Sequence, residues 1–288
     1  MSGRLAIVDA HHHVWDPDAN YHPWLRDKPV SGFRYGDYAP IRRRYLVPDY
    51  LADARNYHVA GSVYVEAEWD PDDPIGEMEY IAAVRRESGY PSVAVAQIWL
   101  DRHDAAQTLE RHADFDFVRS VRQKPRANAS PADRVPGGMA DRRWREGFAQ
   151  LRSRGLRFDL QTPWWHLHEA AALACDFPDT QIIVNHTGLP ADRSADGLAA
   201  WRAVGARAEA RVDLRLDHRE PLRRPRAQIL IGLLEREAIE QFPGRIRHVE
   251  KRRAVGVSEI APIRTHLEEV RRRVPPGERR AADHAVRR

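Results

Sequence analysis

Short apolar runs alternate with amphipathic stretches along residues 1–210 of this 288-residue chain. The runs are rich in β-branched residues, which predicts buried strands, and the stretches between them have the spacing of helices that bury one face. The predicted strands cover residues 5–10, 61–66, 92–99, 116–122, 156–160 and 181–185. The predicted helices cover residues 48–57, 75–88, 105–113, 144–154, 167–176 and 198–210.

Repeated alternation of strands and helices is typical of a parallel sheet. Six such units precede residue 200 and the chain has room for two more, which favours an α/β fold, the (β/α)8 TIM barrel, in a single domain over residues 1–288. Gly89 and Gly155 directly follow predicted helices, as helix C-caps do. We expect a seventh strand at 211–216, from its apolar–polar alternation, and a weak eighth strand at 246–249.

The last quarter of the chain differs from the rest in composition. Residues 211–288 hold 20 Lys or Arg against 12 Asp or Glu, a net charge of +8, whereas residues 1–210 hold 26 against 30, a net of −4. Of the 24 aromatic residues, only Phe242 lies beyond Trp201. Basic clusters attract phosphates, but the many acids and the scarcity of aromatics for base stacking disfavour a nucleic-acid-binding tail. We therefore expect no nucleic-acid partner.

Composition also indicates where the protein is located and which kinds of site it can contain. No apolar run approaches the roughly 18 residues that a membrane span needs, and the N-terminus lacks a signal-peptide core, so we expect a cytoplasmic protein with no membrane partner. Cys175 is the only cysteine, which excludes an internal disulfide and a cysteine-cluster zinc site. Its apolar neighbours indicate a buried structural thiol.

His11 and His13 follow the first predicted strand one residue apart. Because side chains alternate faces along a strand, these two would project from one face and His12 from the other. Two adjacent imidazoles can share a metal ion or one substrate oxygen. An expression-tag remnant is the plain alternative, and the Asp-Ala before and Val-Trp-Asp after the three histidines argue against it.

Polar residues also mark the ends of the later strands. They are Glu66 and Glu68, then Arg119, Arg122 and Lys124, then Gln161, and finally Asn185 and His186.

In a β/α barrel the carboxyl ends of all strands converge on one pocket, so we expect these residues to meet there and bind an anionic or hydroxyl-rich small molecule. Arg122 would hold a carboxylate, and Trp164 and Trp165 could stack on a ring. Each residue has a plainer alternative. Glu66 and Glu68 could pair with Arg85 or Arg86, the tryptophans could be core, and His186 could be structural.

The connection between residues 15 and 48 is rich in Pro, Tyr, Trp and Asp. Connections of that length are uncommon unless they are functional or disordered, and this one is too aromatic for disorder. Because it follows the first strand, we expect it to form a lid over the pocket.

Taken in order, these motifs resemble the amidohydrolase-related enzymes that include pyrone-dicarboxylate and sugar-lactone lactonases. The resemblance covers residues 5 to about 216. It rests on the segments 9–17, 20–25, 63–68, 118–122, 158–161 and 184–188.

The resemblance implies a barrel hydrolase that opens a lactone or similar ester by attack of water. His11 and His13 would orient the substrate carbonyl or hold a metal ion, and His186 would assist at the same centre. Arg122 would bind a substrate carboxylate, beside Glu66, Gln161 and Trp164 as further substrate-binding residues. Some relatives bind one zinc ion and others none, so a divalent metal at His11, His13 and His186 stays open.

The chain departs from this family after residue 216. Relatives should end an eighth strand in Ser-Asp or Ser-Asn, then an aromatic residue and Pro, and where Asp stands there it activates the attacking water. No such tetrapeptide occurs after residue 190. The flanks 236–242 and 276–287 still resemble the family, which suggests local shifts of reading frame between them. A divergent, Arg-rich end is the alternative.

The leading hypothesis is therefore a hydrolase of small carboxylated or hydroxylated lactones or esters. A metal-dependent decarboxylase on the same barrel is the enzymatic alternative. A non-catalytic, ligand-binding barrel is the second, because the eighth-strand motif is missing. The sequence makes no prediction of the oligomeric state.

Overall fold

The computed structural model describes residues 5–27, 29, 36–133, 135–217 and 229–231, and for residues 210–217 and 229–231 it describes the backbone alone. The chain divides into two compact units, Met1–Ile231 and Gly232–Arg288, and the described residues all belong to the first. The expected eighth strand at 246–249 and most of the basic segment 217–288 lie outside the described residues. The single domain over residues 1–288 stays a prediction.

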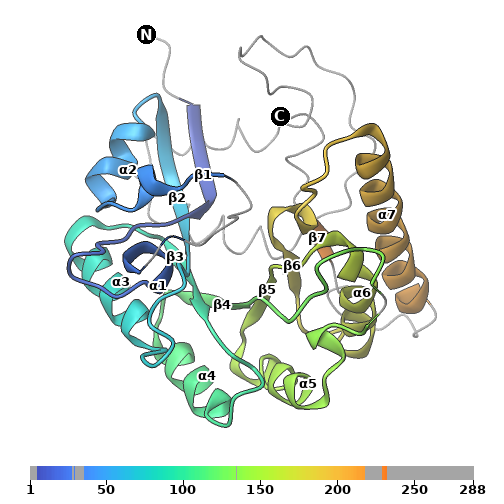
Figure 1. Cartoon of the computed structure of the whole chain (residues 1–288). Helices are drawn as coiled ribbons and strands as arrows, with labels where there is room; N and C mark the ends of the chain where they lie inside the picture. Colours follow the sequence, from blue (N-terminus) through green and yellow to red (C-terminus); the bar gives the residue numbers. More distant parts are fainter. Residues whose placement is uncertain (1–4, 28, 30–35, 134, 218–228, 232–288) are drawn as a thin grey trace. The chain divides into compact units, whose positions relative to one another are not determined.

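The described strands form one parallel sheet in which each strand pairs with the next along the chain. They are β1 (Leu5–His12), β2 (Tyr57–Val65), β3 (Val93–Gln97), β4 (Val118–Gln123), β5 (Arg157–Leu160), β6 (Ile182–Val184) and β7 (Ile229–Ile231). The sheet curls so that helices cover its outer side (Figure 1). Sequential parallel pairing in a curled sheet is the architecture of a β/α barrel, as predicted.

Helices connect the strands along the outer side of the sheet. The α-helices are α1 (Pro23–Arg26), α2 (Val47–Asp53), α3 (Gly76–Ser88), α4 (Ala105–Asp114), α5 (Arg142–Phe148), α6 (Leu167–Asp176) and α7 (Ala195–Asp217). Short 3-10 turns are η1 (Ala39–Ile41), η2 (Gly138–Ala140), η3 (Arg152–Arg154), η4 (Trp164–His166) and η5 (Asn185–Gly188). Within the described part of the chain, no helix is long and apolar enough to cross a membrane.

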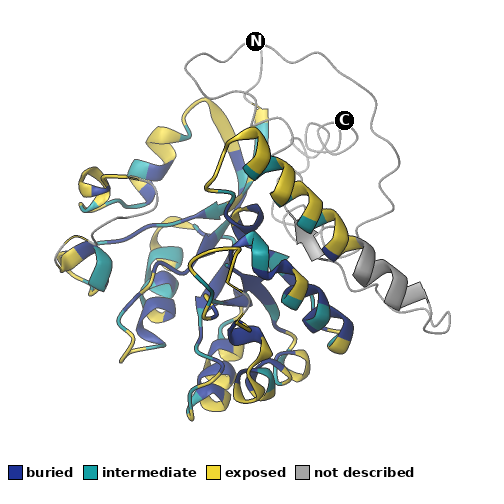
Figure 2. Cartoon of the chain, turned by 45° about the vertical axis from the view of Figure 1, so that its right-hand side comes forward, coloured by how far each residue is buried: buried dark blue, intermediate teal, exposed yellow. Residues whose placement is uncertain are grey.

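The hydrophobic core lies between the strands and these helices, whose solvent faces stay exposed (Figure 2). Trp144 and Phe148 of α5 pack with Phe158 of β5, with ring centroids 5.2 to 5.5 Å apart. All three side chains are fully buried, and aromatic burial of this size is a large part of core stability. Cys175 is buried in the same core, as predicted.

The first six predicted strands are confirmed, with ends that differ by a few residues. Gly89 and Gly155 adopt the left-handed conformation that a C-cap requires, at φ 78° and 68°. The predicted helix at 144–154 is broken into α5 and η3.

The seventh-strand prediction is wrong. Residues 211–216 form the end of α7, and β7 lies at Ile229–Ile231. An apolar–polar alternation of six residues is too short to exclude a helix. The segment and the residues before it are rich in strong helix formers, namely Ala, Arg, Leu and Glu.

Candidate functional site

Three histidines gather at the carboxyl ends of β1 and β6. The ring centroid of His11 lies 5.0 Å from that of His13 and 4.9 Å from that of His186. The strand alternation that the sequence predicted places His12 on the opposite face, stacked on Tyr50 of α2 at 4.5 Å. The predicted histidine cluster is therefore present in the structure.

The imidazole of His13 is held by the backbone of β2. Its Nδ1 lies 2.7 Å from the carbonyl oxygen of Val65, so the ring donates there and leaves Nε2 as the free acceptor. Burial lowers the pKa of His13 to about 3, and Arg122 acts in the same direction. Burial likewise lowers the pKa of His11 to about 2. Both rings are neutral at pH 7.

Glu66 and Arg122 form a buried ion pair beside these histidines. Arg122 Nε donates to Glu66 Oε1 at 2.5 Å, and Arg122 Nη2 donates to the Glu66 backbone carbonyl at 2.5 Å. The guanidinium holds the pKa of the Glu66 carboxyl below its usual value, against the opposing effect of burial. The alternative pairing of the glutamates with Arg85 or Arg86 is wrong, because Arg85 bonds Asp116 and Glu68 bonds Lys124.

The turn after β2 is held by side chains from several other elements. The Ala67 amide donates to Glu77 Oε1 of α3 at 2.6 Å. The Ala67 carbonyl accepts from Trp24 Nε1 at 2.8 Å and faces His22 Nδ1 at 3.1 Å. Trp24 and His22 belong to the long 15–48 connection, so the described part of the expected lid is fastened to the strand end that carries Glu66.

Left-handed backbone conformations mark the same strand ends. Glu68 after β2 has φ 56°, and His186 and Thr187 after β6 have φ 49° and 50°. Residues other than glycine adopt this region rarely, and such strain is concentrated at functional sites. Its occurrence in two of the loops at this edge of the sheet supports the assignment of this edge as the site.

A polar network continues between β4, β5 and β6. Asp159 accepts a hydrogen bond from Ser120 Oγ at 2.5 Å and one from Asn185 Nδ2 at 2.9 Å. Burial raises the pKa of Asp159. These contacts tie the segment that carries His186 to the neighbouring strands.

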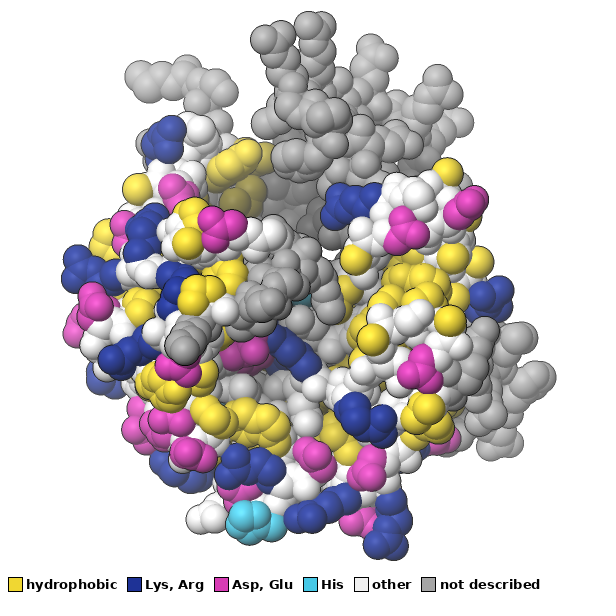
Figure 3. Space-filling model, viewed as in Figure 1, with side chains coloured by type: hydrophobic (Ala, Val, Ile, Leu, Met, Phe, Trp, Pro, Cys, Tyr) yellow, Lys and Arg dark blue, Asp and Glu magenta, His cyan; other side chains and the backbone are white. Residues whose placement is uncertain are grey.

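A cavity of about 340 Å³ opens at the ends of β2, β3 and β4. Its walls include Trp24, Trp69, Trp99, Gln97, Arg122 and Lys124, together with Glu66 and Glu68. Figure 3 shows acidic and basic side chains side by side near the centre of this face, bordered by hydrophobic ones. Aromatic walls combined with convergent polar and charged groups are the composition of a site for a small polar molecule.

The structure does not bring every predicted residue to this place. Trp164 and Trp165 line a separate cavity of about 530 Å³, with His168 and residues of α7. Arg119 lies near the start of β4 and bonds the carbonyls of Asp116 and Val118. Gln161 directly follows β5 and is half-buried. A ring stacked on Trp164 would therefore occupy a different cavity from one beside Arg122.

Several residues at the site had no role in the sequence prediction. They are Tyr64, Glu77, Gln97, Trp99 and Asp159. The motifs that predicted the site lie at strand ends, and Glu77 lies in a helix, so no motif included it. The one signal in the sequence was an acidic residue at a helical position that faces the core.

A metal ion needs several ligating side chains around one point. His11 Nε2 is buried and has no hydrogen-bond partner among the described residues, and neutral imidazoles are the metal-binding form of histidine. Yet the described part of the chain contains no group of three or more His, Cys, Asp or Glu side chains that could hold a metal. The described residues alone do not complete such a site.

Comparisons with known proteins agree with this architecture. Residues 8–267 match the sequence model of the amidohydrolase family, so the match continues past residue 216, where the sequence resemblance ended. An uncharacterized protein of Sinorhizobium fredii is 37% identical over 207 residues, which are 69% of this chain and 67% of that protein.

Solved structures with the same fold come from Burkholderia multivorans. A zinc-bound amidohydrolase matches with TM-score 0.53 and 23% identity, over 70% of this chain and 66% of that chain. A HEPES-bound structure of that amidohydrolase gives the same values. At this identity the likeness shows the barrel fold alone, and the chain spans about two thirds of the length of these relatives.

Proposed function

This chain belongs to the amidohydrolase family, and on that basis we propose that it is a hydrolase that opens a small lactone or related ester by attack of water. The substrate would carry a carboxylate or hydroxyl groups and bind at the carboxyl ends of the strands. The observation that carries the proposal is the cluster of His11, His13 and His186, with ring centroids about 5 Å apart beside the buried Glu66–Arg122 pair.

The histidines are suited to binding the reacting carbonyl group and the attacking water. Each neutral imidazole has one N–H donor and one lone pair, and both rings of the β1 pair project from one face. His13 has its Nδ1 committed to Val65, which fixes the ring so that Nε2 faces away from that bond. That nitrogen carries no proton, so His13 can accept a hydrogen bond from the attacking water. An N–H of the neutral His11 ring can donate to the carbonyl oxygen and stabilise the negative charge that develops there.

The assay is a panel of lactones, with and without attached carboxylates, followed by proton release in weakly buffered solution. We expect the purified full chain to open at least one of them. If none is opened, either by protein supplied with zinc or by protein dialysed against a chelator, the proposal fails. Lactones that raise the melting temperature without turnover would favour a non-catalytic binding barrel instead.

The alternative of a decarboxylase is distinguished by its product. Aromatic carboxylic acids are offered in the same experiment, and release of CO2 without lactone opening would favour that activity. A metal ion of the kind seen in the Burkholderia relative is tested by elemental analysis of the purified protein, before and after chelation. Zinc in stoichiometric amount that disappears in a His11→Asn variant would assign it to this cluster.

A further inference from the structure

The cavity at the ends of β2, β3 and β4 contains two cations, Arg122 and Lys124, in different electrostatic situations. We propose that this cavity binds a ring-bearing, carboxylated part of the substrate, and that Lys124 rather than Arg122 is the cation that binds the carboxylate. This inference rests on the proposed hydrolase function, which supplies a carboxylated substrate.

Arg122 already uses its charge inside the protein. Its side chain is 4% exposed and the Glu66 side chain is 2% exposed. Two of its nitrogens donate to Glu66, one to the carboxylate and one to the backbone carbonyl. A substrate carboxylate could take over this guanidinium only by leaving a buried Glu66 charge without its partner, which is strongly unfavourable. Arg122 is therefore a positioning residue that holds the turn after β2.

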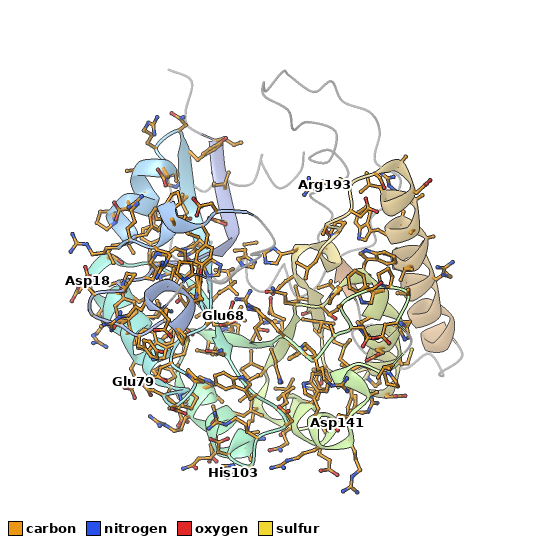
Figure 4. The ribbon with its side chains drawn as sticks, in the orientation of Figure 1. Asp18, Glu68, Glu79, His103, Asp141 and Arg193 are labelled. Carbon is orange, nitrogen blue, oxygen red and sulfur yellow. The ribbon has the colours of Figure 1, made fainter. Side chains whose placement is uncertain are left out.

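Lys124 is in the opposite situation. Its side chain is 37% exposed and its partner, Glu68, is 49% exposed. Ion pairs between exposed side chains contribute little, since water solvates each partner after separation. Glu68 lies toward the centre of the view in Figure 4, whereas Glu79, His103 and Asp141 lie at the periphery. Lys124 can thus exchange Glu68 for a substrate carboxylate at the inner margin of the site, with little cost in free energy.

Three tryptophans give the cavity its apolar walls. Trp24 is fixed by its hydrogen bond to the Ala67 carbonyl, and Trp69 is stacked on Tyr80 with centroids 5.8 Å apart. The third wall, Trp99, has Arg102 over its ring at 5.4 Å. Indole rings held in place in this way bind a flat ring with little loss of side-chain entropy.

A second polar group in the wall indicates what else the ligand carries. The side-chain oxygen of Gln97 is buried and has no hydrogen-bond partner among the described residues. A buried acceptor without a partner is unfavourable, and a hydroxyl group on the ligand would satisfy it. The ligand class is therefore a small ring that carries a carboxylate and a hydroxyl group.

The test measures equilibrium binding, so that it does not depend on turnover. The probes are 3-hydroxybenzoate and its neutral counterpart 3-hydroxybenzamide, titrated calorimetrically into the full chain. We expect Lys124→Gln to weaken binding of the acid by about tenfold or more, as loss of a charge-assisted bond does, and to leave binding of the amide nearly unchanged. Arg111→Gln is the matched control, because Arg111 is exposed and pairs with the peripheral Glu79.

Two results would overturn the inference. One is binding of 3-hydroxybenzoate by the Lys124→Gln variant as tight as by the unchanged protein, and the other is no measurable binding of the acid by the unchanged protein. Failure of the proposed hydrolase is separable. If no lactone is opened while binding of the acid still depends on Lys124, the subsite stands and the reaction class is wrong.

Discussion

Arg122 illustrates how burial decides what a charged side chain does. Its position at the end of a strand suggested a carboxylate-binding residue, and in the structure it lies at that strand end but is bonded to Glu66. Sequence spacing predicts which face of a strand a side chain occupies. It does not predict that Arg122 pairs with Glu66, an acid that lies 56 residues away at the end of another strand.

The ion pair makes a stability prediction. Arg122→Met should lower the free energy of unfolding by about 3–5 kcal/mol, because it leaves the Glu66 charge buried without a partner. The double variant Arg122→Met with Glu66→Met should recover much of this loss. Urea unfolding of the single and double variants measures both values. A loss below about 1 kcal/mol in the single variant would contradict the assignment.

The histidine cluster makes an activity prediction. His11→Asn should lower kcat/KM for the substrate found in the lactone panel by about a hundredfold or more, since a positioned catalytic group contributes that much. The unfolding midpoint should change little, because His11 Nε2 has no hydrogen-bond partner among the described residues. His103→Asn, at an exposed position on the periphery, is the control and should retain full activity.

At the scale of elements, the site depends on the way α3 supports the end of β2. Glu77 reaches from the first turn of α3 to the Ala67 amide and accepts a hydrogen bond from Tyr64 at 2.9 Å. Burial, followed by the nearby Glu66 carboxylate, raises the pKa of Glu77 to about 8. The carboxyl group is therefore protonated at neutral pH and acts as a neutral strut.

The protonated Glu77 carboxyl group predicts that the free energy of unfolding depends on pH. The pKa of Glu77 is raised on folding, so its contribution to stability is complete below pH 4.5 and is lost as the pH rises toward 8. Glu77→Gln replaces the carboxyl group by an amide of similar shape that stays neutral at every pH, and it should remove this loss. The difference in unfolding free energy between variant and unchanged protein should increase from pH 5 to pH 8, by an amount on the order of a few kcal/mol. A difference that is constant with pH would show that Glu77 is ionised in the folded protein.

At the scale of the whole molecule, buried neutral histidines limit stability in acid. Burial lowers the pKa of His12 and of His112 to about 4. Their pKa values are depressed on folding, so the stability is present above the unfolded value of 6.5 and is lost as the pH falls from there toward 4.

The size of this loss can be measured against pH. At pH 5.5 the two histidines together should cost about 2–3 kcal/mol relative to pH 7.5, because each unit of pKa difference corresponds to about 1.4 kcal/mol. The experiment is urea unfolding at both pH values in the Glu77→Gln background, which removes the opposite effect of that carboxyl. His112→Gln in this background should reduce the measured loss by about 1–1.5 kcal/mol, its own share, because the depressed pKa values of His11 and His13 contribute over the same pH range. Equal stability at both pH values would refute the prediction.

The sequence by itself determined the order of the first six strands, the barrel class and the histidine cluster. These follow from periodicity and from the rule that strand ends converge, as the neighbouring rings of His11, His13 and His186 confirm. Local alternation failed at 211–216, where strong helix formers continue α7. Only the tertiary structure decided which charges pair, because burial is a property of the packed chain: it commits Arg122 to Glu66, leaves Lys124 in a solvated pair and places Trp164 in a separate cavity.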